Sequence, residues 1–227
     1  EYKPMMEGIR GELPHLEHIF YIDGKGSDDF AAILLTEALE DSAGANDTLA
    51  ACRPGPNDVN EVIYTSGTTG QPKGVMHTAN STYGHLGSWI EHLDLKQNDK
   101  IFMASPLAHQ TGFLYAILQP IMLGAEVVLL DRWDAPVGVE LMQKHGCTFT
   151  MGATPFLSDI VEMPNVQDFD LSKLHTFASA GAPIPPALVQ KAAANFSFKV
   201  LSGWGMTECA ASTICDPNDP EEKVWTS

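Results

Sequence analysis

The sequence predicts an α/β fold in which helices cover both faces of a largely parallel sheet. Strand-like runs and helical stretches alternate from about residue 59 onward. Such alternation requires crossover connections, and these keep successive strands parallel. The segments richest in glycine and hydroxyl residues directly follow strand-like runs. Because ligands of parallel sheets bind beyond the carboxyl ends of the strands, we expect the functional site at these loops.

The regular elements can be assigned in order along the chain. Strands are predicted at 61–64, 75–77, 101–103, 126–130, 148–151, 176–179 and 199–201. Helices are predicted between them at 80–92, 111–123, 137–145, 156–162 and 186–194. Asn80 and Thr154 carry short polar side chains suited to cap a helix, and Pro185-Pro186 suits a helix start.

The residues before 59 follow a less regular pattern. The stretch 41–60 is rich in Gly, Pro, Asn and Asp, which favour turns and loops. We therefore predict an irregular lead-in and polar connector over residues 1–58, followed by the α/β core over residues 59–227.

Composition excludes several classes of protein. With 44% hydrophobic residues the chain can bury a substantial core, and its formal net charge of −16 argues against nucleic acid and anionic membranes as partners. The four cysteines have neither C-x-x-C spacing nor a paired framework, which favours free thiols in a reducing cytoplasm over disulfides. No stretch has the character of a signal peptide or a transmembrane helix.

The segment 65–74 carries the most chemical information. It reads Thr-Ser-Gly-Thr-Thr-Gly-Gln-Pro-Lys-Gly and follows a predicted strand. Glycines let backbone N–H groups approach an anion, hydroxyls add donors, and Lys73 adds a positive charge. The alternative is a flexible surface turn. Because Lys73 follows a proline and precedes a strand, the segment is not a Walker P-loop; we expect a mobile loop between two strands that holds a polyphosphate.

Two further segments also follow predicted strands. Ser-Gly-Trp-Gly-Met-Thr-Glu at 202–208 offers an aromatic ring for a purine, a hydroxyl and a carboxylate. A carboxylate beside a phosphate site is unfavourable without a cation between them, so Glu208 suggests Mg²⁺. The segment Ala-Gly-Ala-Pro at 180–183 would let a flat ring lie against the backbone. Each of the two can instead be a tight turn or a strand end.

Together the three segments, in this order, resemble the acyl-adenylate-forming (AMP-binding) superfamily, and in particular its acyl-CoA synthetase branch. The resemblance spans residues 59–215 and implies a layered α/β/α fold that is part of the large domain of such an enzyme. It also implies a ligase that uses ATP, Mg²⁺ and coenzyme A. A carboxylate would attack the α-phosphorus of ATP, giving an acyl-adenylate and pyrophosphate, and the acyl group would then pass to the thiol of coenzyme A.

The resemblance also implies roles for individual residues. The β- and γ-phosphates would be held by Thr65, Ser66, Gly67, Thr68, Thr69, Gly70 and Lys73. Adenine would be contacted by Gly181, Ala182, Pro183 and Trp204. Thr207 would bond the α-phosphate and Glu208 would hold Mg²⁺, which makes Lys73, Thr207 and Glu208 the predicted catalytic residues.

The segment 105–113, Ser-Pro-Leu-Ala-His-Gln-Thr-Gly-Phe, resembles the acid-binding region of the family. His109 would orient the substrate carboxylate; the alternative is a hydrogen-bonded histidine at a helix start. No Asp or Glu occurs from 105 to 125, so an α-amino acid would leave its ammonium unpaired. The pattern looks most like ligases for alicyclic or short- to medium-chain fatty acids, as in fatty acid metabolism. The predicted substrate-binding residues are His109, Gln110, Gly112, Gly203 and Met206. Gly112, Phe113, Tyr115, Gly152 and Met206 suggest a compact, mostly apolar pocket.

Other motifs of the family are absent, including the Thr-Gly-Asp segment and the small C-terminal domain with its lysine. We therefore expect the chain to be an internal piece of the large domain with little activity of its own. Two alternatives stay open beside the acid–CoA ligase. One is an enzyme that loads the thiol of a carrier protein, and the other is a non-catalytic nucleotide-binding module.

Overall fold

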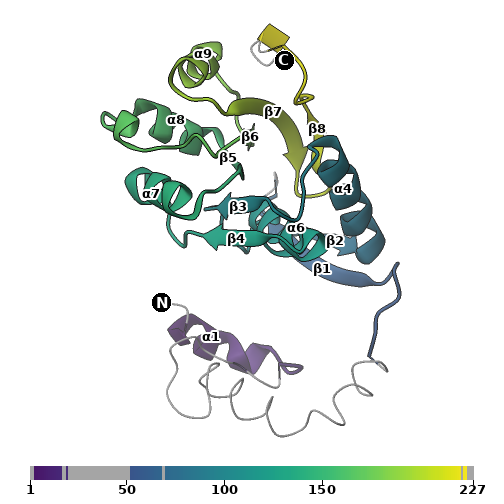
Figure 1. Ribbon diagram of the computed structural model, residues 1–227. Coiled ribbons are helices and arrows are strands. Elements are labelled where there is room, and N and C mark those ends of the chain that lie inside the picture. Colours follow the sequence, from purple (N-terminus) through teal and green to yellow (C-terminus); the bar gives the residue numbers. More distant parts are fainter. Residues whose placement is uncertain (1–2, 17–18, 20–51, 68–69, 221, 224–227) are drawn as a thin grey trace, which may run out of the picture. The chain divides into compact units, whose positions relative to one another are not determined.

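The computed structural model describes residues 3–16, 19, 52–67, 70–220 and 222–223 (Figure 1). The chain divides into two compact units, Glu1–Pro54 and Gly55–Ser227; we predicted a boundary between residues 58 and 59. In the first unit the described elements are α1 (Lys3–Ile9) and η1 (Arg10–Glu12), neither of which has a buried residue. Most of the predicted polar connector, up to residue 51, lies outside the described residues.

The second unit contains a two-stranded and a six-stranded sheet. Antiparallel strands β1 (Val59–Thr65) and β2 (Lys73–Thr78) form the first. The second has the order β4-β3-β5-β6-β7-β8 and comprises β3 (Lys100–Met103), β4 (Glu126–Leu129), β5 (Phe149–Ala153), β6 (Thr176–Ala180), β7 (Lys199–Met206) and β8 (Ala210–Ile214). All pairs from β4 to β7 are parallel, and only β8 is antiparallel. The predicted largely parallel sheet is thus confirmed.

Helices cover both faces of the larger sheet, which confirms the three-layered fold class (Figure 1). One layer contains α7 (Ala135–His145), α8 (Thr154–Glu162) and α9 (Pro186–Asn195). The other contains α4 (Ala79–His92), α5 (Gln110–Phe113), η3 (Leu114–Leu118) and α6 (Gln119–Leu123). Successive strand residues alternate between the layers: Phe102 packs with the first, whereas Ile101 and Met103 pack with the second. Two hydrophobic layers therefore hold the sheet on both sides.

Three details differ from the sequence-based assignment. The predicted cap Asn80 is wrong: Thr78 caps α4, because β2 runs directly into the helix and the Thr78 side chain accepts a hydrogen bond from Ser81 N. The predicted cap Thr154 is also wrong, since it is the first residue of α8 and donates its hydroxyl to the Ala182 carbonyl at 3.0 Å. Strand β8 was not predicted, whereas Pro185-Pro186 begins α9 as expected.

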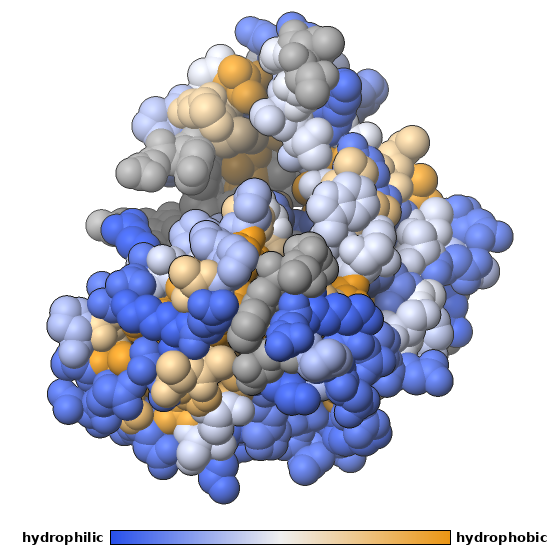
Figure 2. Space-filling model, turned by 90° about the horizontal axis from the view of Figure 1, so that it is seen from above, coloured by the Kyte–Doolittle hydropathy of each residue, from blue (hydrophilic) through white to orange (hydrophobic). Residues whose placement is uncertain are grey.

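Each helix in the part of the chain that the structure describes is too short or too polar to cross a membrane. On the face shown in Figure 2, hydrophobic residues form small groups among hydrophilic ones. Cys52, Cys147 and Cys209 are free thiols, and burial raises the pKa of the Cys147 thiol to about 11.

Candidate functional site

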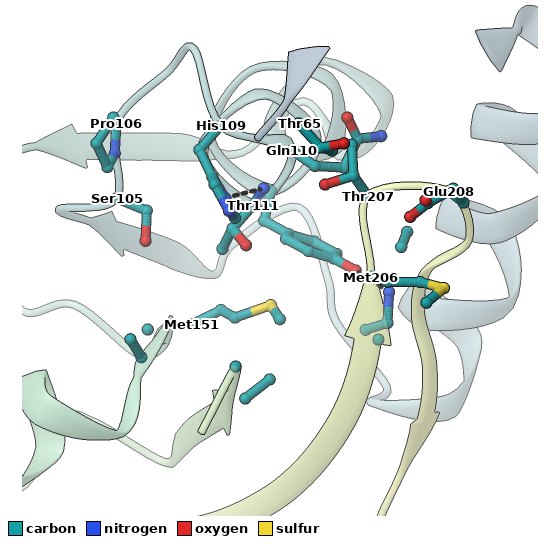
Figure 3. Close-up of a pocket in the computed structure, with 18 of the residues that line it drawn as sticks. Thr65, Ser105, Pro106, His109, Gln110, Thr111, Met151, Met206, Thr207 and Glu208 are labelled. Carbon is teal, nitrogen blue, oxygen red and sulfur yellow. Dashed lines mark hydrogen bonds between the residues drawn. The ribbon is translucent and has the colours of Figure 1, made fainter. Parts of the chain in front are cut away.

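A cavity of about 670 Å³ opens beyond the carboxyl ends of the parallel strands (Figure 3). Its walls come from the residues after β1, β3, β5 and β6 and from the tip of the β7–β8 hairpin. The chain adds β4 on one side of β3 and then returns to place β5 on the other side. The crossover connections therefore diverge at β3 and β5 and leave a crevice there, which is where open parallel sheets bind ligands. The lining residues are Thr65, Ser66, Gly67, Lys73, Ser105, Pro106, His109, Gln110, Thr111, Tyr115, Met151, Gly152, Ala153, Phe156, Ala180, Gly181, Gly205, Met206, Thr207, Glu208, Ala210 and Ala211.

The predicted phosphate loop joins two strands, as expected. Thr65 pairs with Lys73 in the β1–β2 ladder, so the loop closes on itself and places both residues at the cavity. Gly67 has φ +63°, and a Cβ there would lie 2.2 Å from the Gln71 carbonyl oxygen, so only glycine fits this turn. Thr65, Ser66, Gly67 and Lys73 line the cavity, Gly70 does not, and Thr68 and Thr69 lie outside the described residues.

The tip of the β7–β8 hairpin brings two of the predicted catalytic residues, Thr207 and Glu208, to the same cavity. Strand β7 extends to Met206, and Thr207, Glu208 and Cys209 form the turn before β8. Met206, Thr207 and Glu208 line the cavity. Trp204 and Gly203 lie farther down β7 and do not line it; the Trp204 side chain is 59% exposed.

The segment 180–183, predicted to lie against adenine, contributes two residues to the cavity. Gly181 lines it, together with Ala180 at the end of β6, whereas Ala182 and Pro183 do not. The carbonyl of Ala182 accepts the hydroxyl of Thr154, which ties this loop to the start of α8. The loop after β6 is therefore anchored to the start of α8, which follows the neighbouring strand β5.

His109 and Gln110 lie where β3 passes into α5. His109 lines the cavity and also caps α5, because its Nδ1 accepts a hydrogen bond from Thr111 N at 3.1 Å (Figure 3). With Nδ1 as an acceptor, Nε2 is the donor of the neutral ring. Gln110 is 4% exposed, and its amide has no hydrogen-bond partner among the described residues. Burial raises the pKa of the Glu61 carboxyl, and Gln110 is close enough to oppose that shift, so this amide lies near another buried polar group.

The remainder of the cavity is mostly apolar. Met151 and Gly152 of β5 and Phe156 of α8 form one wall, and Tyr115 lies buried beneath the site. Burial raises the pKa of the Tyr115 phenol and keeps it neutral. Among the described residues that line the cavity, Glu208 is the single carboxylate.

Sequence reasoning named Tyr115 and Gly152 as pocket residues but missed several others that line the cavity. These are Ser105, Pro106, Thr111, Met151, Ala153, Phe156, Ala180, Gly205, Ala210 and Ala211. Most of them stand within a few residues of a strand end, so proximity to predicted strand ends is the signal that could have found them. Phe113 was expected in the pocket and does not line it.

Gly112, predicted to bind substrate, does not line the cavity. It allows α5 to lie against the preceding loop, because a Cβ at Gly112 would be 2.2 Å from the Pro106 carbonyl oxygen and 2.8 Å from that of Ser105. Backbone atoms cannot move aside as a flexible side chain would. The close packing of this turn thus positions His109 and Gln110.

We expect Gly112→Ala to lower the free energy of unfolding by about 1–3 kcal/mol, as overpacking a tight core does. Urea denaturation measures this change. Gly84→Ala in α4 is the matched control, because a Cβ added at Gly84 would meet no other atom within 4 Å. This substitution should raise the free energy of unfolding by about 0.5–1 kcal/mol through helix propensity. Equal effects of the two substitutions would contradict the packing role of Gly112.

Comparison with known proteins gives a consistent result. The family model described as "AMP-binding enzyme" matches residues 4–227. The chain is 32% identical over 212 residues to a medium-chain fatty-acid–CoA ligase of Escherichia coli (strain K12), which covers 93% of this chain and 37% of that protein. It is 27% identical over 211 residues to a benzoate–CoA ligase of Thauera aromatica, covering 92% of this chain and 38% of the relative.

A solved structure has the same fold. The inhibitor-bound N-terminal domain of FACL13 from Mycobacterium tuberculosis superposes with a TM-score of 0.65 at 26% identity, over 75% of this chain and 44% of that chain. The present chain therefore spans less than half the length of these relatives. Because the family model matches nearly the whole sequence, the chain belongs to the AMP-binding enzyme family.

Proposed function

We propose that this chain forms the core of an AMP-forming acid–CoA ligase that activates an apolar carboxylic acid with ATP. One observation carries the proposal: the phosphate loop, the hairpin tip with Thr207 and Glu208, and the pair His109–Gln110 all line a single cavity. The relatives named as acid–CoA ligases support it. Acyl-adenylate formation needs a polyphosphate site, an α-phosphate site and an acid site within reach of one another.

In the proposed reaction, a substrate carboxylate oxygen bonds to the α-phosphorus of ATP and the bond to the bridging oxygen of pyrophosphate breaks. Lys73 and the loop that begins at Thr65 neutralise the negative charge that builds on the departing pyrophosphate. The Thr207 hydroxyl donates to an α-phosphate oxygen. Nε2–H of His109 donates to the substrate carboxylate and orients it. These groups act by position and charge, which is what in-line substitution at phosphorus requires.

Glu208 fits a role in holding Mg²⁺. The described residues contain no cluster of three metal-ligating side chains, and Glu208 is the single carboxylate found at the cavity. Mg²⁺ in nucleotide sites is commonly held by one or two carboxylates together with substrate phosphates and water, so one carboxylate suffices. When bound, the ion would neutralise phosphate charge. Lys73, Thr207 and Glu208 are the residues that we propose as catalytic.

The nucleotide base would lie along the loop after β6. Gly181 is the member of the predicted adenine set that lines the cavity, and we propose it as the border of the ring. Trp204, Ala182 and Pro183 follow or precede lining residues but do not line the cavity themselves. We therefore propose that these three residues contribute less to adenine binding than the sequence pattern suggested.

The wall formed by Met151, Phe156 and Met206 favours an apolar acid. An α-amino acid is disfavoured because its ammonium group would need a carboxylate partner in the acid site. Glu208, the carboxylate at the cavity, stands instead on the hairpin tip beside the proposed phosphate site. Relatives named for medium-chain fatty acids and for benzoate act on apolar monocarboxylates, which supports a substrate of that class.

Coenzyme A is the proposed acceptor because both of these relatives are named as CoA ligases. The cysteine spacing, which shows no paired framework, favours a reducing cytoplasm, and the net charge of −16 argues against nucleic acid partners.

The test is a panel of matched acids given to the full-length protein, with AMP release followed in the presence and absence of coenzyme A. Octanoate and 2-aminooctanoate differ by one ammonium group, and cyclohexanecarboxylate and benzoate vary the shape. We expect release with one or more of the apolar acids, none with 2-aminooctanoate, and stimulation by coenzyme A. AMP release that requires the amino acid would overturn the proposed substrate class. Release that requires a carrier protein instead of coenzyme A would favour the carrier-loading alternative.

A further inference from the structure

His77 connects two parts of the site that lie far apart in the sequence. It stands on β2, the strand that begins at Lys73, and its side chain is 6% exposed. Its Nε2 lies 2.8 Å from the carbonyl oxygen of Thr207, 130 residues away. Because a carbonyl oxygen can only accept, Nε2 carries the hydrogen and donates it. The strand that leaves the phosphate loop is thus bonded directly to the hairpin tip.

The Thr207 carbonyl belongs to the peptide that joins Thr207 to Glu208. A hydrogen bond to this oxygen fixes the orientation of the peptide plane. Because the plane contains the Cα atoms of Thr207 and Glu208, it also sets the positions from which both side chains extend. The other end of the tip is held as well: Tyr115 Oη accepts a hydrogen bond from Ala211 N at 3.3 Å and lies 2.7 Å from His85 Nε2. Burial lowers the pKa of His85, so the neutral ring can accept the phenol hydrogen. Buried polar side chains therefore anchor the tip on both sides of Glu208.

The conformation of the tip explains why it needs these anchors. Ala210 has φ +54°, a left-handed conformation that is unfavourable for residues other than glycine. Such a conformation persists when surrounding contacts determine it. The three-residue turn 207–209 is therefore followed by an alanine that surrounding contacts must hold in its left-handed conformation.

Polar groups surround His77 on its own strand pair and on the neighbouring helices. Glu61 is its partner in the β1–β2 register, and Ser81 Oγ lies 3.5 Å from Nδ1. Burial raises the pKa of the Glu61 carboxyl, while His77 and the nearby Gln110 oppose that shift. His77 thus lies among groups that restrict its ring, with Nε2 directed to Thr207.

We propose that His77 is a positioning residue, which holds the Thr207–Glu208 turn in register with the phosphate loop. The inference rests on the proposed function, because it gives these residues their roles. Without the Nε2 donor the turn should relax while Lys73 and the loop keep their places. The chemical step should then suffer more than ATP binding does.

The experiment compares His77→Leu, which keeps an apolar volume and removes the donor, with His77→Gln, whose amide nitrogen can replace Nε2. In the 227-residue chain, backbone hydrogen exchange at 205–211 should become about 10-fold faster in the leucine variant and stay near wild type in the glutamine variant. Exchange in β3 and β5 should not change. His145→Leu, on the exposed last turn of α7, is the matched control and should leave both regions unchanged.

In the full-length protein, His77→Leu should lower kcat for acid-dependent pyrophosphate exchange about 10- to 100-fold with a KM for ATP within about 3-fold, and His77→Gln should recover most of the rate. Equal loss in both variants, or a leucine variant with wild-type exchange at the tip, would overturn the inference. If the leucine variant does not fold, His77→Asn, whose shorter side chain cannot reach Thr207, takes its place. A wild-type protein without adenylation would refute the proposed function, whereas hydrogen exchange still decides whether His77 holds the turn.

Discussion

Replacing Lys73 by alanine is expected to reduce acid-dependent pyrophosphate exchange by about 10²–10³-fold, the usual effect of removing one preorganised donor from a transition state. Lys73 is the first residue of β2 and lines the cavity beside the phosphate loop. Its charge would be needed most as pyrophosphate leaves, since negative charge then accumulates on the departing group. The rate is measured in the full-length protein with a saturating apolar acid.

Nucleotide binding to the same variant separates this role from a general defect. Lys73→Ala should weaken ATP binding while AMP binding stays unchanged, because AMP lacks the phosphates that Lys73 would contact. Lys73→Arg keeps the charge but not the compact ammonium, so intermediate values are expected. Lys144→Ala, on the exposed end of α7, is the control. An equal loss of ATP and AMP affinity would show that Lys73 does not contact the leaving group.

The second large effect is expected from Glu208→Gln, which keeps the size of the side chain and removes its charge. If Glu208 holds Mg²⁺, the rate of adenylation should fall about 10²-fold and the Mg²⁺ concentration for half-maximal rate should rise. The measurement is a Mg²⁺ titration at fixed ATP in the full-length protein. Chelation of the metal should abolish activity in both wild type and variant.

A matched substitution controls for the loss of one acidic group from an acidic protein. Glu140→Gln removes a carboxylate from the exposed side of α7 and should leave the Mg²⁺ dependence unchanged. A Glu208→Gln variant with the wild-type Mg²⁺ dependence would remove Glu208 from the metal site, whatever its rate. A reduced rate with unchanged Mg²⁺ dependence would instead indicate a role in positioning.

Much of the fold could be predicted because the relevant signals are local. The seven predicted strands and five predicted helices all correspond to elements of the structure, and the phosphate loop joins two strands as expected. Strand β8 escaped prediction because its residues, Ala-Ala-Ser-Thr-Ile, carry little alternation of apolar and polar side chains. Thr78 was missed as a cap because the strand passes directly into the helix and no loop marks the boundary.

The chemical groups of the candidate site could be predicted from the sequence, but the residues that line the cavity could be predicted only in part. Lys73, His109, Thr207 and Glu208 could be named from residue type and from their position after strands, and all four line one cavity. Gly112, Gly203 and Trp204 occur in the same segments and lie outside the cavity lining. Residue type alone does not distinguish the two groups, since the direction of each side chain depends on how far a strand extends and where it turns.

The sequence by itself determined the order of strands and helices, the α/β class and the types of chemical group available at the strand ends. These depend on short-range preferences and on periodicity over a few residues. Only the tertiary structure decided that β5 lies beside β3, that the β7–β8 hairpin turns at Thr207, and that His77 meets its carbonyl 130 residues away. The physical reason is that such contacts follow from the packing of two hydrophobic layers on one sheet, which no local pattern specifies.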